Sequence, residues 1–258
     1  MINNEYDIPF EFQVVHGSEA IKTCLELSEE KGITPVIMGG PRDIEVLFRS
    51  KSEETPKEII ERSKNFNIKE FVKKEDKGLE DDLELLGEFE GWEDDLVDEI
   101  KEFMEQEEEW LEDYPELFGE FEEGEDVPCE QKEGITAHLN ILSKQPLEQV
   151  YIGLIPTEAS FEIPAYVSFG DWNWCPKPEE HVGIMRYWNE KYGIEIASIT
   201  SGVIECIVKN PPSTKEEALE LAKEQYCYCP DIVEQGTQTI AALVATLLNN
   251  KYWYFWWD

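Results

Sequence analysis

Apolar and polar positions alternate in patterns that predict both helices and strands in the first 78 residues. A helical repeat extends over 18–32 and ends at a glycine, and a second helix over 55–63 begins with a threonine N-cap followed by proline. The short apolar run at 33–38 contains a proline, which is typical of an edge or entry strand. Residues 43–48 fit either a strand or a helical turn. We therefore expect a small α/β part at the N-terminus.

The pattern from residue 134 onward predicts a larger set of elements. Two strands flank a Ser-Gly pair and form a hairpin, and the last strand is apolar on both faces, so we expect it inside a sheet. The predicted strands cover residues 150–155, 165–169, 194–200, 203–209 and 252–257. The predicted helices cover residues 177–192, 213–226 and 238–248. This mixed order favours an α+β fold with helices flanking a mixed sheet.

Between these two parts, carboxylates surround a helical stripe of apolar residues. Residues 79–126 hold 24 Asp or Glu and one basic residue, Lys101, so they carry −23 of the formal net charge of −36. Apolar side chains recur at steps of three, four and seven, which predicts an amphipathic helix. The stripe consists of Trp92, Leu96, Val97, Ile100, Phe103, Met104, Trp110, Leu111 and Tyr114. Like charges four residues apart weaken an isolated helix, so we expect this one to dock against an apolar surface.

These patterns divide the chain into three parts. We expect a small N-terminal α/β part over 1–78, an acidic helical insert over 79–128, and a C-terminal α+β domain over 129–258.

The charge balance of the whole chain narrows the choice of partners. The chain has 58 Asp or Glu against 22 Lys or Arg, and such an excess repels nucleic acid phosphates and anionic membranes. We expect a basic protein partner, and neither nucleic acid nor a membrane. The first residues show no signal peptide, no apolar stretch approaches the ~20 residues of a membrane helix, and the six cysteines lack framework spacing. These features predict a cytoplasmic protein with reduced thiols.

Several motifs of rare residues in the C-terminal part occur in the order seen in one bacterial family. They include Phe169-Gly170-Asp171-Trp172-Asn173 with Cys175-Pro176, Glu180-His181, Arg186-Tyr187-Trp188, Glu205, Tyr228-Cys229-Pro230-Asp231 and the closing Trp253-Tyr254-Phe255-Trp256-Trp257-Asp258. In these residues the chain resembles the domain of unknown function 4253, over about residues 154–258. It departs from the family pattern at Trp174, at Cys227 and in the acidic insert. The resemblance implies a C-terminal domain after a less similar N-terminal part, and it implies no activity, cofactor or catalytic residue.

Cysteine and histidine residues of the C-terminal part point to two kinds of chemistry, each with a plainer interpretation. Cys175, His181, Cys227 and Cys229 would supply four soft ligands, but their spacing is not that of a structural zinc site. A nucleophilic arrangement could form from Cys175, His181 and Asp231, or from Cys229 and Asp231, but no local nucleophile signature accompanies them. Buried thiols beside aromatic rings explain the same residues. We therefore expect neither a metal nor a cofactor.

A polar and aromatic set in the C-terminal part is the candidate lining of a small-ligand pocket. It consists of Trp172, Asn173, His181, Glu224, Gln225 and Asp231. The same carboxylates and amides could instead cap helix ends near the turn at Pro230.

No complete catalytic motif is present, so we expect a non-enzymatic protein whose acidic surface neutralises a basic protein partner, as an immunity protein or inhibitor does. The predicted partner-binding residues are Trp92, Glu93, Asp94, Asp95, Asp98, Glu99, Phe103, Glu107, Glu108, Trp110 and Tyr114. Two alternatives stay open. One is an enzyme or small-ligand binder that uses the C-terminal pocket, and the other is a structural two-domain protein with a solubilising linker.

Overall fold

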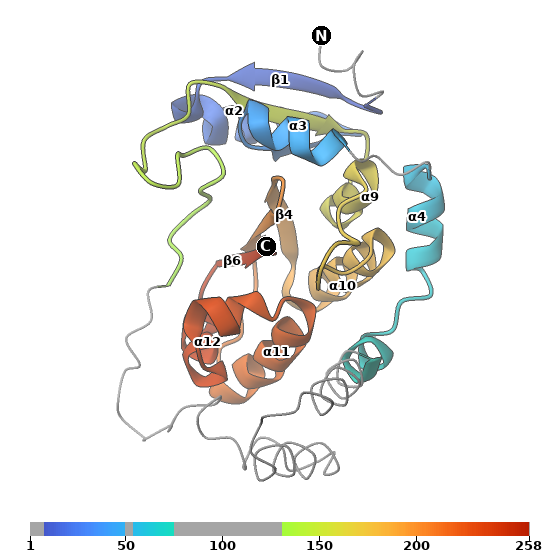
Figure 1. The fold of residues 1–258 in the computed structure, drawn as a ribbon, viewed down its shortest axis with the longest axis vertical. Helices are drawn as coiled ribbons and strands as arrows, with labels where there is room; N and C mark the ends of the chain where they lie inside the picture. The colour runs from blue at the N-terminus through green and yellow to red at the C-terminus, as the bar shows by residue number, and fades with distance from the viewer. Residues whose placement is uncertain (1–7, 50–53, 75–130, 258) are drawn as a thin grey trace, which may run out of the picture. The chain divides into compact units, whose positions relative to one another are not determined.

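The computed structural model describes residues 8–49, 54–74 and 131–257 (Figure 1). The predicted acidic insert at 79–128, with all the predicted partner-binding residues, lies outside these described residues. The described chain forms two compact units. The first comprises residues 8–49, 54–66, 131–212 and 249–257, and the second comprises residues 67–74 and 213–248.

The first unit is built on a six-stranded mixed sheet with the strand order β1-β3-β2-β4-β5-β6. Its strands are β1 (Glu11–Val15), β2 (Thr34–Ile37), β3 (Val150–Ile155), β4 (Ile194–Ile199), β5 (Val203–Val208) and β6 (Tyr252–Trp256). All neighbouring pairs are antiparallel except β2 and β4, which run parallel. The predicted α+β class, with a mixed sheet flanked by helices, is confirmed.

Helices connect and cover these strands. In the first unit they are η1 (Gly17–Glu19), α2 (Ala20–Leu27), α3 (Pro41–Arg49), α4 (Pro56–Ser63), η2 (Ser160–Glu162), α9 (Ile163–Val167) and α10 (Pro178–Tyr192). The second unit contains α11 (Lys215–Tyr228), the π-helix η3 (Ile232–Thr237) and α12 (Ile240–Leu247). The segment 43–48, which fits a strand or a helical turn by its sequence, belongs to α3.

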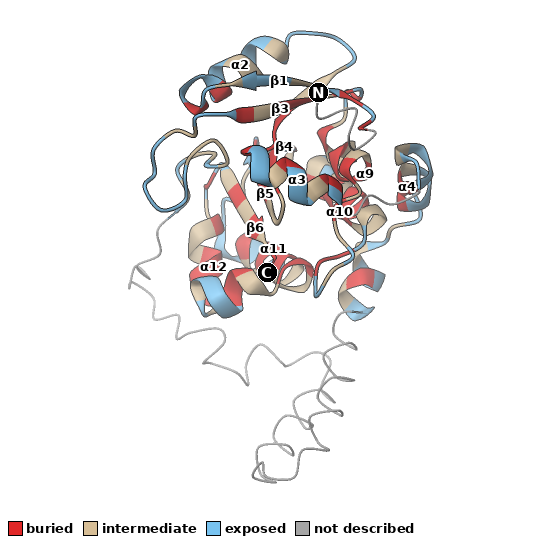
Figure 2. Cartoon of the chain, turned by 45° about the horizontal axis from the view of Figure 1, so that its top comes forward, coloured by how far each residue is buried: buried red, intermediate tan, exposed pale blue. Residues whose placement is uncertain are grey.

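Both faces of the strands β1, β3 and β2 are covered. On one face, Ala20 of α2 forms a buried cluster with Ile37 and Val150. On the other face, Phe48 of α3 packs edge-on against Phe10 and Phe12, with ring centroids 6.0 and 6.3 Å away. Figure 2 shows exposed residues on α2, α3 and β1, whereas β3 contains buried residues.

The helices α4, α9 and α10 pack against one another, and α10 also packs against β4 (Figure 1). Ile59 of α4, Ala165 of α9 and Val182 of α10 form a buried cluster among them. Trp188 of α10 stacks on Phe255 of β6, with ring centroids 5.6 Å apart, and both side chains are fully buried. This packing holds α10 in place, and the first turn of α10 borders the candidate site.

Strand β2 comes from the N-terminal part of the sequence but lies between β3 and β4 of the C-terminal part. The sheet therefore joins strands from both ends of the chain. The predicted edge position of β2 is also wrong. Pro35 is tolerated in this interior strand because β2 and β4 share one registered pair, Ile37 with Ser198, so the proline interrupts no pairing on that side.

Two strand predictions in the C-terminal part need correction. The predicted strand at 165–169 is instead the helix α9, which begins with Pro164 in its first turn. A short apolar run does not by itself distinguish a buried strand from a buried helix. The predicted strand at 252–257 forms as β6, but it lies at the edge of the sheet and pairs with β5 alone. Trp253 and Phe255 are its buried residues.

Candidate functional site

The residues that resemble the family motif fold into a loop between α9 and α10, which we call the motif loop (residues 168–177). Four of its residues adopt the left-handed backbone region, with φ of 49° at Ser168, 112° at Gly170, 68° at Asp171 and 48° at Asn173. Three of these are not glycine, and such conformations persist only where surrounding contacts hold them. A strained, firmly held loop of this kind is typical of a functional site.

A buried thiol–imidazole pair holds the motif loop on α10. The Cys175 Sγ lies 3.3 Å from Nε2 of His181, and the imidazole is fully buried, with its centroid 5.0 Å from the Phe169 ring and 5.3 Å from the Trp257 ring. Burial lowers the pKa of His181 to about 3, against a smaller opposing effect of its hydrogen bond to the Pro176 backbone.

The protonation of this pair follows from its hydrogen bonds. A neutral imidazole that donates to the Pro176 carbonyl through one ring nitrogen accepts the Cys175 S–H through Nε2. The thiol is buried and has no charged imidazole beside it to stabilise a thiolate. This geometry supports the packing interpretation of Cys175 and His181 over the nucleophilic one.

The buried His181 predicts a pH dependence of stability. The unfolded imidazole titrates near 6.5 and the folded one near 3, so the unfolded state binds more protons between these values. The free energy of unfolding should therefore fall by up to about 1.4 kcal/mol per pH unit as the pH decreases from 6.5. Urea unfolding at pH 7.0, 6.0 and 5.0 measures this slope. A His181 imidazole signal that titrates near pH 6 in the native protein would contradict the assignment.

Gly170 is the residue on which the motif loop depends most directly. A Cβ at this position would lie 2.0 Å from the Pro176 carbonyl oxygen and 2.9 Å from Nε2 of His181, and its φ of +112° is unfavourable for other residues. The substitution Gly170→Ala should lower the free energy of unfolding by about 1–3 kcal/mol or more. It should also speed the alkylation of Cys175, followed by mass spectrometry of the peptide that contains it. The control is Gly134→Ala, where a Cβ meets no atom within 4 Å; equal effects of both variants would refute this role.

A pocket of about 730 Å³ lies beside the motif loop. The loop contributes residues 168–172 and Lys177, and the other lining residues include Glu54, Arg62 and Glu179. The charged lining residues are three carboxylates and two cations, so both signs of charge lie beside the Trp172 ring. The volume is that of a small-molecule site.

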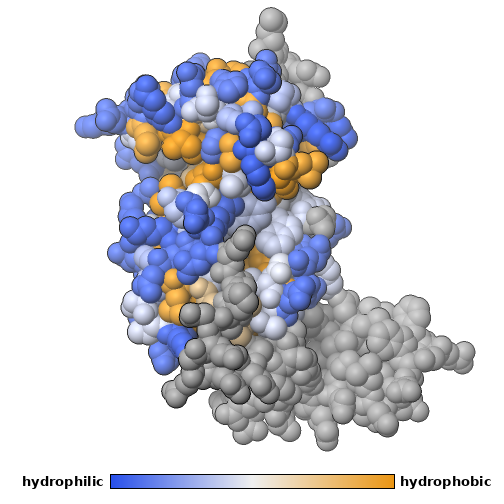
Figure 3. Space-filling model, turned by 90° about the vertical axis from the view of Figure 1, so that its left-hand side faces the viewer, coloured by the Kyte–Doolittle hydropathy of each residue, from blue (hydrophilic) through white to orange (hydrophobic). Residues whose placement is uncertain are grey.

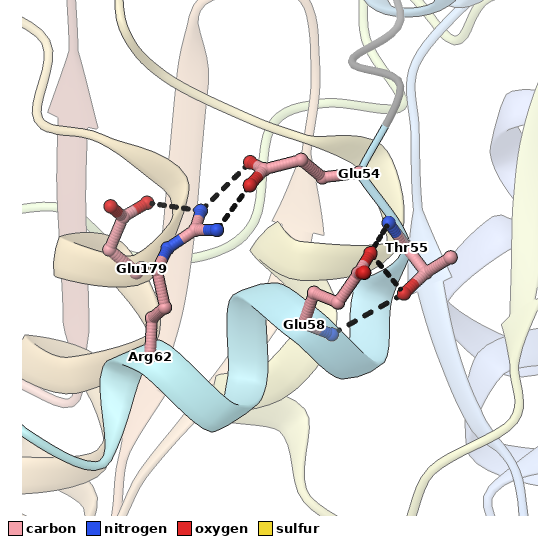
Figure 4. Close-up of polar contacts among 5 residues, drawn as sticks. All are labelled: Glu54, Thr55, Glu58, Arg62 and Glu179. Atoms are coloured by element: carbon pink, nitrogen blue, oxygen red, sulfur yellow. Dashed lines mark hydrogen bonds and ion pairs between the residues drawn. The ribbon is translucent and has the colours of Figure 1, made fainter.

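Arg62 of α4 organises the wall of this pocket (Figure 4). Its guanidinium donates to both carboxylate oxygens of Glu54, with Nη2 2.8 Å from Oε2, and Nη2 also donates to Oε2 of Glu179 at 3.2 Å. The hydrogen bond from Arg62 lowers the pKa of Glu54. Glu179 lies in the first turn of α10, so this cluster links α4 to the start of α10.

The position of Arg62 depends on how α4 begins. Thr55 is the N-cap, and its Oγ1 accepts from the Glu58 backbone N–H at 3.4 Å. The Glu58 carboxylate in turn accepts from the Thr55 N–H at 2.8 Å. This capping box sets the register of α4, which places Glu54 immediately before the helix and Arg62 two turns into it.

The structure brings together only part of the pocket that the sequence predicts. Trp172 lines the pocket, Asn173 is exposed on the motif loop, and His181 is buried on α10 rather than in the lining. Glu224, Gln225 and Asp231 belong to the second unit, where Gln235 Nε2 donates to Asp231 Oδ1 at 2.9 Å and Gln225 is buried. The residues that sequence reasoning missed are Glu54, Arg62, Lys177, Glu179 and Ser201. No local signal could have paired Arg62 with Glu179, because they are 117 positions apart.

No metal centre is built by the described part of the chain, where no group of three or more His, Cys, Asp or Glu side chains is placed to hold an ion. Of the four soft ligands considered from the sequence, Cys175 and His181 lie in the first unit, and Cys227 and Cys229 in the second.

The fold and the site define an α+β protein with a small-molecule-sized pocket beside a strained motif loop. Residues 151–258 match the model of a family described as a domain of unknown function (DUF4253), which confirms the resemblance that the sequence motifs of the C-terminal part indicate. The match contains the motif loop and the strands β4 to β6, whereas β1, β2 and Arg62 precede it. No curated protein and no solved structure matches the chain. Among the helices in the described ranges, none is long and apolar enough to cross a membrane.

Proposed function

We propose that this protein is a non-enzymatic binding protein that neutralises a basic protein partner, in the manner of an immunity protein or an inhibitor. The concentration of charge carries the proposal, since residues 79–126 hold 24 carboxylates and one basic residue. A field of this sign accelerates the encounter with a basic partner, and aromatic anchors slow its release. The buried, neutral Cys175–His181 pair is consistent with binding rather than with thiol chemistry.

The experiment compares the full chain with a variant whose residues 79–126 are replaced by a neutral linker of equal length. The full chain should retain a basic protein from a host extract at low salt and release it at high salt, because screening weakens interactions between exposed charges. The linker variant should retain much less of it. Equal retention by both chains would refute the proposal and favour a structural linker.

The pocket beside the motif loop favours a second candidate function, the binding of a small ligand. Arg62 and Lys177 offer positive charge, Asp171 and Glu179 offer negative charge, and Trp172 offers an aromatic face. This combination fits a small molecule that carries both an anionic and a cationic group, such as a free amino acid or a short peptide.

A thermal-shift screen of free amino acids and dipeptides tests this second candidate. A ligand of the pocket should raise the melting temperature of the full chain and of the linker variant equally. The shift should disappear in Trp172→Ala and persist in Trp174→Ala, because Trp174 is 57% exposed and lies outside the lining. A screen without any shift, or a shift that survives Trp172→Ala, would count against the pocket.

A further inference from the structure

A second pocket lies beside β2 and β4, where these two neighbouring strands of the sheet are not paired. Strands β2 and β4 share one registered pair, Ile37 with Ser198, and a groove of about 800 Å³ is lined by the N-terminal ends of both strands. Two side chains of the groove bind backbone groups of β4 on this side. Ser160 Oγ accepts from the Ile196 N–H at 3.2 Å, and Asn189 Nδ2 donates to the Ile194 carbonyl at 2.6 Å. These two bonds satisfy the Ile196 N–H and the Ile194 carbonyl of β4 without a neighbouring strand.

The walls of this groove leave apolar side chains exposed. Ile21 and Leu25 of α2 are 39% and 67% exposed, and Ile207 of β5 is 39% exposed. These are three of the eight large hydrophobic residues that are exposed in the described chain, and they line one groove. Figure 3, which faces the side where α2 lies, shows apolar patches set among hydrophilic residues. Exposed apolar side chains gathered in this way are typical of a binding surface.

The charged residues of the groove have one predominant sign. The lining holds four carboxylates, from Glu29, Glu30, Glu158 and Glu195, against one cation, Lys31, which gives a net charge of −3. Of the four, Glu195 is engaged by a lysine outside the groove at 2.5 Å. The other three carboxylates lie on exposed residues. An occupant that complements this groove therefore carries apolar side chains next to positive charge.

We propose that this groove binds a segment of the basic protein partner that carries apolar side chains next to Lys or Arg. The proposal rests on the proposed function and deepens it, because it places a docking surface on the described part of the chain. The protein's own segment 79–126 is a poor occupant although the chain after it, at Gly134 and Ile135, lines the groove. Its 24 carboxylates would face the carboxylates of the groove.

The probe is a synthetic peptide of Lys and Leu at helical spacing that carries a photoreactive residue, and its control is the same peptide with Glu in place of Lys. Binding of each peptide to the full chain is measured by calorimetry at low salt, and the cross-linked sites are mapped by mass spectrometry. The rim variant combines Glu29→Gln, Glu30→Gln and Glu158→Gln. The matched control variant combines three exposed carboxylates outside the groove, namely Glu11→Gln, Glu148→Gln and Glu190→Gln.

We expect the Lys-Leu peptide to cross-link to residues 21–35 or 158–161, and to bind the rim variant about tenfold more weakly than the matched control variant. Cross-links confined to residues 79–126, with equal affinity for both variants, would overturn the groove while leaving the proposed function intact. Failure of the Lys-Leu peptide to bind anywhere would overturn both. Binding of the Glu-Leu peptide in the groove, or a gain in groove cross-links when 79–126 is replaced by the neutral linker, would also overturn this inference.

Discussion

Replacing Glu205 by alanine is expected to lower the free energy of unfolding by about 3–5 kcal/mol. Glu205 lies on β5 with its carboxylate fully buried, and Lys132 Nζ is 2.5 Å from its Oε1. The carboxylate also accepts from Ser198 Oγ at 2.6 Å, from the Thr136 N–H at 2.9 Å and from the Ala137 N–H at 3.0 Å. In the alanine variant, Lys132 and these hydrogen-bond donors would lose their acceptor although they lie in a buried or partly buried environment.

The pH dependence of this carboxylate follows from the same contacts. Burial alone would raise the pKa of Glu205, but Lys132 and the hydrogen bonds from Ser198 and Thr136 together lower it. The contribution of Glu205 to stability is therefore present at neutral pH and is lost as the pH falls through its folded pKa.

Urea unfolding and hydrogen exchange measure the effect of Glu205→Ala. The amides of Thr136 and Ala137 should lose protection, because Glu205 ties this segment to the sheet. The control is Glu195→Ala on β4, whose side chain is 51% exposed and paired with Lys209, and it should change stability by no more than about 0.5 kcal/mol. A Glu205 variant as stable as the Glu195 variant would contradict this account.

Neutralising the carboxylates of the acidic segment is expected to slow association with the basic partner by roughly 100-fold at low salt. The variant replaces Glu93, Asp94, Asp95, Asp98, Glu99, Glu107 and Glu108 by their amides. A matched variant keeps every charge and changes the four aromatic anchors, Trp92, Phe103, Trp110 and Tyr114, to alanine. It should bind at the native rate and dissociate faster, because charge acts on the encounter while buried aromatics act on release. Stopped-flow association and surface plasmon resonance separate the two effects, and a loss of association rate in the aromatic variant alone would contradict these roles.

Local signals predicted many of the helices and strands. The N-cap residues Thr55 and Thr214 each form a capping box that starts a helix, and Ser201-Gly202 joins the hairpin of β4 and β5. The order of the strands was not predictable in this way. Strand β2 lies between two strands that come more than a hundred residues later, because buried apolar strands pair through long-range packing that leaves no short-range pattern.

The same contrast holds for the candidate site. Trp172 lines the pocket and was predictable, because it belongs to a cluster of rare residues in the sequence, whereas Asn173 and His181 of the same cluster lie outside the lining. Arg62 was not predictable, because an arginine on a helix is common. Its role depends on its hydrogen bond to Glu179 on another helix. The groove was also missed, since Ile21 and Leu25 look like the buried stripe of an amphipathic helix until the structure shows them exposed.

The most direct test of partner neutralisation is the salt dependence of the association rate. The basic protein captured from the host extract is purified, and its association with the full chain and with the carboxylate-neutralised variant is measured between 50 and 500 mM salt. The full chain should associate at least about tenfold more slowly at the higher salt concentration, and the neutralised variant should be slow and nearly insensitive to salt. An association rate that is the same for both chains and unaffected by salt would contradict the proposed function.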